Sequence, residues 1–118
     1  MSNDTKNKGV VLRGLQETLA DIYRLSGELT LTQMRVLVYV IRREKVTGSD
    51  ICKALDLSRP TVSRSIATLA DEKISRRDMD PIGFLRIEHD PLDRRVKYAV
   101  LTEKGKALGH RIVELFNP

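Results

Sequence analysis

The apolar residues between positions 47 and 72 recur at intervals of three and four, the spacing that places side chains on one face of a helix. Thr47 and Ser58 each stand at the start of such a run, where a hydroxyl can accept a hydrogen bond from a backbone N–H of the first turn. Pro60 falls in the first turn of the second run, where its missing N–H has little effect. The pattern predicts a helix-turn-helix. The residues predicted to face inward on its second helix are Val62, Ile66 and Leu69.

The opposite face of this second helix has the composition expected of a helix that enters the DNA major groove. Its small residues allow close approach, its hydroxyls can donate to phosphate oxygens, and Arg64 can span the edge of a guanine. Ser58 and Arg59 would hold backbone phosphate at the helix start. The alternative is a solvated helix of an ordinary bundle, but the preceding helix and the tight turn favour DNA recognition. The candidate DNA-binding residues here are Ser58, Arg59, Thr61, Ser63, Arg64 and Thr68.

Three further segments show helical periodicity. Residues 10–25 and 102–116 each carry an apolar stripe on one side. Residues 30–43 are apolar around most of the circumference and open with a possible capping box of Thr30 and Gln33, which predicts a central buried helix. Because the two terminal stripes exceed what a domain of this size covers, we expect a partner subunit to pack against them.

Residues 84–101 switch to the alternation typical of β-strands. Residues 84–88 alternate apolar and charged side chains, and residues 96–101 alternate again around a polar turn, so the sequence predicts a β-hairpin. The residues of the second strand predicted to face inward are Val96, Tyr98 and Val100.

The tip of this hairpin is cationic. Asp93 can orient a neighbouring guanidinium through a bidentate pair, so that either Arg94 or Arg95 is presented in a fixed pose. An arginine presented in this way suits the narrow, electronegative minor groove beside a helix docked in the major groove. The candidate DNA-binding residues of the hairpin are Arg86, Asp93, Arg94 and Arg95.

The composition indicates a single soluble domain of 118 residues. There is no apolar run near the roughly 18 residues of a membrane span, and the polar N-terminus lacks a leader, so we expect a cytoplasmic protein without a membrane partner. Residues 1–9 are predicted to be disordered and 10–118 to form the domain. The net charge of +5 suits a polyanion, and because the excess is spread along the chain, any positive face must be assembled by folding.

Few residues suggest catalysis, metal binding or a cofactor. Cys52 is the only cysteine, which excludes an intrachain disulfide, and a structural role for it is favoured over a redox sensor. His89 and His110 lack metal-ligand spacing, so no metal site is predicted. Asp78 and Asp80 have no recognisable catalytic partner, so an enzyme is the least supported class and no catalytic residue or cofactor is assigned.

The order of these elements resembles the MarR family (multiple-antibiotic-resistance regulators) of winged helix-turn-helix proteins. The similarity covers about 31–107, and its most specific parts are LSRPTVSRSIATL in the recognition helix and GFLRIEHDPLDRRVKYAVLTEKG through the wing. Two features depart from the family pattern. The segment ISRRDMDPI lies between recognition helix and wing, and the sequence stops where relatives usually add another dimerisation helix.

The resemblance implies a mainly α fold with a small β-hairpin and with N- and C-terminal dimerisation helices. It also implies a homodimer that binds palindromic double-stranded DNA and regulates transcription, commonly as a repressor. Family members are often released by phenolic ligands or oxidants, but the sequence assigns no effector. A second possibility is a winged-helix docking module that binds a polymerase or replication partner, since a fold does not determine function. Steep salt dependence would distinguish DNA binding from apolar docking.

Overall fold

A computed structural model describes residues 2–70 and 82–117, with side chains from residue 7 onward. Over these ranges the chain forms five helices and a three-stranded antiparallel sheet, the mainly α winged helix-turn-helix architecture that the sequence predicts. The last residues of the predicted helix-turn-helix and most of the segment 72–83, including Asp78 and Asp80, lie outside the described ranges. In chain order the elements are α1 (Ser2–Ser26), α2 (Leu31–Arg43), β1 (Lys45–Thr47), α3 (Gly48–Leu55), α4 (Arg59–Leu69), β2 (Leu85–His89), β3 (Lys97–Leu101) and α5 (Glu103–Phe116).

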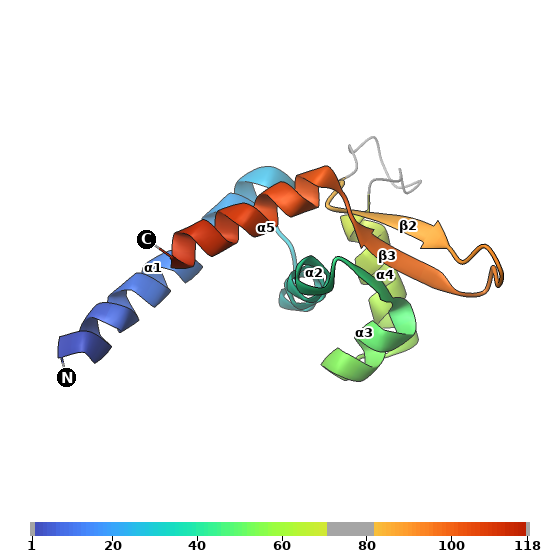
Figure 1. The fold of residues 1–118 in the computed structure, drawn as a ribbon, viewed down its shortest axis with the longest axis horizontal. Coiled ribbons are helices and arrows are strands. Elements are labelled where there is room, and N and C mark those ends of the chain that lie inside the picture. The colour runs from blue at the N-terminus through green and yellow to red at the C-terminus, as the bar shows by residue number, and fades with distance from the viewer. Residues whose placement is uncertain (1, 71–81, 118) are drawn as a thin grey trace.

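The molecule consists of a helical arm and a compact lobe (Figure 1). Helices α1 and α5 lie side by side in the arm, which holds both chain ends, while α3, α4 and the sheet form the lobe. The overall extents are 54 × 32 × 24 Å. No helix in the described part of the chain is both long and apolar enough to cross a bilayer.

Helix α2 is the centre of the core, as its apolar circumference predicts. Val36, Leu37 and Val40 are fully buried, and the helix contacts α3, α4, α5, β1 and β3. The predicted capping box is present, because the Gln33 amide donates to Thr30 Oγ1 at 3.1 Å and the Thr30 amide donates to Gln33 Oε1 at 2.9 Å.

Helix α1 begins earlier than the sequence indicates. We predicted disorder over residues 1–9, whereas the structure continues the helix back to Ser2. The segment contains no proline and only one glycine, Gly9, so little in it opposes a helix. Its polar residues produce no apolar periodicity, and that is why the helical pattern becomes visible only near Val10.

The arm is held by a polar contact between its two helices. Asp21 of α1 is buried, and Arg111 of α5 donates to its carboxylate at 2.9 Å. Arg24, one turn further along α1, pairs with the same carboxylate. A buried carboxylate with two cationic partners avoids the penalty of an unpaired buried charge, so this contact fixes how α5 lies against α1.

The sheet has three strands in the order β1-β3-β2, one more than the predicted hairpin. Strand β1 was missed because three residues are too few to show alternation. Of the predicted inward positions, Val100 is buried, but Val96 and Tyr98 are only half-buried, and the face assigned to the three residues is wrong. Residues paired across strands share a face, and Ala99 pairs with Ile87, Leu101 with Leu85. The core side of β3 is therefore formed by Ala99 and Leu101, and Val100 lies on the other side between Lys45 and Arg86.

The end of α4 is joined directly to the start of the wing. The Phe84 amide donates to the Leu69 carbonyl at 3.0 Å, and the Gly83 amide donates to the Ala70 carbonyl at 3.1 Å. Ala70 also forms a parallel β-bridge with Leu85. These contacts set the position of β2 relative to α4.

The wing is joined to α5 through Thr102 and Gly105 of the LTEKG segment. Thr102 caps α5 by accepting from the Gly105 amide at 3.1 Å, while its own hydroxyl donates to the Gly83 carbonyl at 2.6 Å. The backbone of Gly105 lies so close to Phe84 that a Cβ at this position would overlap the Phe84 carbonyl oxygen. Only glycine fits this junction.

We expect Gly105→Ala to lower the free energy of unfolding by about 1–3 kcal/mol, the usual cost of forcing an extra carbon into a packed site. Gly9→Ala is the matched control, because a Cβ there meets nothing within 4 Å. Replacing an exposed helical glycine should instead raise stability by up to about 0.5–1 kcal/mol. Urea denaturation of both variants measures the difference, and equal midpoints would contradict the predicted overlap.

Candidate nucleic-acid interface

Helix α4 presents the face that the sequence predicts. Val62 and Leu69 are 2% and 0% exposed, and Ile66 is half-buried against the core. On the outer side Ser58, Arg59, Ser63 and Arg64 are exposed, whereas Thr61 and Thr68 are half-buried. The candidate residues of α4 therefore occupy one continuous surface.

The polar side chains of α4 are partly ordered by the helix itself. Ser58 caps the helix by accepting from the Thr61 amide at 3.3 Å. Arg64 Nε donates to the Pro60 carbonyl at 3.3 Å, which places the guanidinium alongside the first turn. The Thr68 hydroxyl donates to the Arg64 carbonyl at 3.0 Å, so Thr68 offers acceptor lone pairs and a methyl group rather than the predicted phosphate donor.

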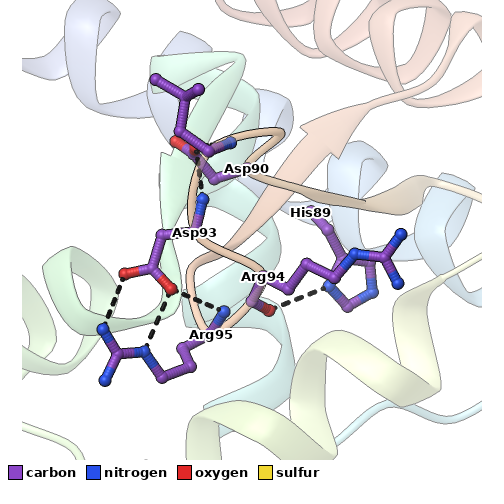
Figure 2. A network of polar contacts seen from close by, with 6 residues as sticks. His89, Asp90, Asp93, Arg94 and Arg95 are labelled. Carbon is purple, nitrogen blue, oxygen red and sulfur yellow. Dashed lines mark hydrogen bonds and ion pairs between the residues drawn. The ribbon is translucent and has the colours of Figure 1, made fainter.

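At the wing tip, Asp93 holds Arg95 in the predicted fork (Figure 2). Arg95 Nε donates to Asp93 Oδ1 at 3.0 Å and Nη2 donates to Oδ2 at 3.2 Å, and the Arg95 amide adds a third bond at 3.1 Å. Arg94 takes no part in this bidentate contact. Its side chain is directed away from Arg95, and its carbonyl lies 3.4 Å from His89 Nδ1. Arg95 is therefore the arginine presented in a fixed pose.

Asp90, which the sequence reasoning missed, organises the same tip. One carboxylate oxygen accepts from the amides of Leu92 at 2.8 Å and Asp93 at 3.2 Å, and the other accepts from the Tyr98 hydroxyl at 3.1 Å. An aspartate that bonds to the amide two residues on is the signature of an Asx turn. The Asp-Pro dipeptide at 90–91, which favours turn initiation, was the available signal.

These contacts change the acidity of the tip. The Leu92 amide, more than any other group, lowers the pKa of Asp90, and the Arg95 guanidinium lowers the pKa of Asp93. The bond to Asp90 raises the pKa of Tyr98. Because both aspartate pKa values are lowered, these carboxylates stabilise the folded tip above about pH 3.9, the ordinary aspartate value. That contribution is lost as the pH falls through the lowered pKa values.

A groove of about 570 Å³ separates α4 from the wing. It contains cationic side chains from both sides, Arg59 from α4 and Arg95 and Lys97 from the wing region. Thr47 and Ser49 at the start of α3 also line the groove. The walls of this groove come from segments that are distant in sequence, so the periodicity of apolar residues along the chain could not reveal it.

The structure does not bring Arg86 into this groove. Its guanidinium bonds to Glu88 at 2.9 and 3.0 Å. Ile87 lines the groove, and since successive residues of a strand point to opposite faces, Arg86 is directed to the other side of the sheet. Cys52 is half-buried at the groove, and the described residues contain no cluster of three potential metal ligands.

We expect Arg95→Ala to raise the pKa of Asp93 toward the ordinary value of about 3.9, because the guanidinium is the main cause of its lowering. Arg94→Ala removes the same charge from the neighbouring position and should leave Asp93 almost unchanged. Titration of the side-chain carboxyl carbons by NMR distinguishes the two variants. Equal shifts of Asp93 in both would show that the fork is not formed in solution.

Comparison with known proteins gives a consistent assignment. Residues 28–74 match a family model described as "MarR family". The HTH-type transcriptional regulator TcaR of Staphylococcus aureus (strain Newman) is 31% identical over 80 residues, which are 68% of this chain and 47% of TcaR. The chain therefore spans about half the length of the curated relative that it matches.

Solved structures share the fold. BpsR of Bordetella bronchiseptica, whose DNA binding is described as regulated by 6-hydroxynicotinic acid, matches with a TM-score of 0.57 and 27% identity over 92% of this chain and 76% of that one. A mutant of S. aureus MepR bound to an oligodeoxyribonucleotide matches with a TM-score of 0.67 and 23% identity, covering 99% and 78%. With its helix-turn-helix, its wing and these relatives, the chain belongs to the MarR family of winged helix-turn-helix proteins.

Proposed function

We propose that this protein is a transcriptional regulator that binds double-stranded DNA as a homodimer. The observation that carries the proposal is the cationic groove between α4 and a wing whose arginine is already held in place. TcaR is named as a transcriptional regulator, and the MepR structure holds DNA. We accordingly expect no enzymatic activity and place the protein in the cytoplasm.

In this proposal α4 enters the major groove, which is wide enough to admit a helix. Arg64 reads a guanine edge, and its neighbours Ser63 and Thr61 contact bases or phosphates. Ser58 and Arg59 hold the backbone where the helix begins, since the first helical amides and a nearby cation both favour a phosphate.

The groove between α4 and the wing takes the sugar-phosphate strand that separates major from minor groove. Arg59 approaches this strand from one side and Lys97 from the other. Arg95 then reaches the minor groove, where a narrow A·T-rich segment concentrates negative potential. Arg86 is the weakest of the candidate contacts, because it faces away from the groove and pairs with Glu88.

The homodimer accounts for the apolar surface of the arm. Leu12, Leu15 and Leu19 of α1 are 44–51% exposed although they recur at helical spacing, and Val113 of α5 is 62% exposed. A contiguous apolar stripe of this kind is typical of an interface. A two-fold dimer would present two α4 helices to a palindromic site, and such a complex on a promoter would repress transcription.

A protein-docking role remains the second candidate from the sequence, and the groove does contain apolar side chains such as Val62, Ile66 and Ile87. Its three cations, Arg59, Arg95 and Lys97, suit a polyanion better than an apolar partner, so DNA binding is the role we favour. Salt separates the two roles, because each phosphate neutralised adds a slope of about −0.9 to the plot of log affinity against log salt.

Arg64→Ala and Arg95→Ala should weaken DNA binding in different ways. After the preferred duplex has been selected from random sequences, Arg64→Ala should lose about 1–3 kcal/mol of discrimination against a changed base pair. Arg95→Ala should weaken binding more evenly across sequences and reduce the salt slope. Fluorescence anisotropy over a salt series measures both effects.

Arg42→Ala is the matched control for this experiment. Arg42 is an exposed arginine on α2 that stacks over Tyr39 and does not line the groove. Its replacement removes the same charge and should leave both affinity and discrimination nearly unchanged. Salt-insensitive binding that is equal for wild type and all three variants would contradict the DNA-binding proposal.

Leu15→Glu should convert the dimer to a monomer, because it places a charge in the apolar stripe of α1. Light scattering at several protein concentrations gives the mass directly. Leu92→Glu is the control, since Leu92 is 96% exposed on the wing, at the opposite end of the molecule from the arm. A wild-type protein that stays monomeric at micromolar concentration would contradict the dimer.

A further inference from the structure

The wing tip presents an apolar side chain beside its fixed arginine. Leu92 is 96% exposed, more than any other large hydrophobic residue in the described part of the chain. Single exposed leucines are common on protein surfaces and by themselves indicate little. The position of this one, between the two aspartates that order the tip, distinguishes it.

The backbone that carries Leu92 is held on both sides. Its amide donates to Asp90 Oδ1 at 2.8 Å, and Asp90 is itself bonded to the Tyr98 hydroxyl. The turn is closed by two backbone bonds of 2.9 Å, from the Asp90 amide to the Val96 carbonyl and from the Val96 amide to the Asp93 carbonyl. Ordering this turn on binding would therefore cost little entropy, which favours an interaction made through the tip.

The fold itself does not require leucine at this position. The turn uses only the backbone amide of residue 92, which any residue except proline supplies. With 96% of the residue in solvent, its side chain contributes almost nothing to the core. A leucine presented in this way is suited to contact with something outside the chain.

We infer that Leu92 is a specificity-determining residue that inserts partly into the base stack from the minor groove. This inference rests on the proposed DNA-binding function. Leucine is among the apolar side chains that proteins use as wedges between base steps. Arg95, fixed on the same turn, supplies the cation that a narrow minor groove attracts.

A side chain that wedges between two adjacent base pairs recognises how easily these pairs unstack rather than which bases form them. Pyrimidine–purine steps such as TA unstack readily, whereas A-tracts are stiff. The wing would therefore favour a flexible step at a fixed distance from the sequence read by α4, at base pairs with which the protein makes no directional hydrogen bond.

The test uses the intact 118-residue chain and duplexes in which one TA step is moved through an otherwise A-tract flank of the selected site. Wild type should bind best with the step at one position, by about fivefold, the lower end of the effect of a single changed base pair. A 2-aminopurine placed at that step should brighten on binding, since unstacking removes its quenching. Leu92→Ala should lose both the positional preference and the brightening, while its discrimination at the sequence read by α4 and its salt slope persist.

Leu31→Ala is the matched control, because Leu31 is 72% exposed at the start of α2 and does not line the groove. It should retain the positional preference, and both variants should keep the wild-type unfolding midpoint because neither side chain is buried. If wild type shows no flank preference, or if Leu92→Ala keeps it, the role of Leu92 is overturned while DNA binding stands. If wild type binds no duplex at all, the proposed function fails first.

Discussion

The burial of one side of α4 is the constraint on which the rest of the geometry depends. Val62 and Leu69 are fully buried against the core, so the rotation of the helix about its axis is fixed. A rotation of one residue, about 100°, would expose these side chains and bury polar ones in their place. Each apolar side chain lost from the core would cost about 1.5–3 kcal/mol, so the outward pose of Ser63 and Arg64 follows from packing on the opposite side.

The wing is ordered in a different way, because its tip has no core. Its side chains are mostly exposed, and hydrogen bonds to two carboxylates take the place of apolar burial. Asp90 shapes the backbone and Asp93 orients a single guanidinium, so the two aspartates have separate tasks. The tip thus depends on ionised groups, whereas the recognition helix depends on apolar contact.

The sequence predicts well those features that have a local cause. The caps at Thr30, Thr47 and Ser58 are all formed, because each depends on a hydroxyl and an amide three residues away. The face of α4 was also predictable, since a helix of eleven residues shows three turns of periodicity.

Features with a non-local cause were missed or wrong. The inward side of β3 was misassigned because valine and tyrosine at 96, 98 and 100 look more apolar than their neighbours, while pairing with β2 decides the face. The groove and the grouping of Arg59 with Lys97 depend on α4 and the wing meeting in space. The helical conformation of residues 2–9 was missed because a polar helix has no apolar pattern.

The junction between Leu69–Ala70 and Gly83–Leu85 has a consequence for how this protein could vary among its relatives. Both ends of the intervening segment are fastened to each other by backbone hydrogen bonds and a β-bridge. The distance between recognition helix and wing is therefore independent of how many residues the segment contains. The segment can change in length and sequence, or gain a separate function, without altering the spacing at which the two DNA-reading elements meet a duplex.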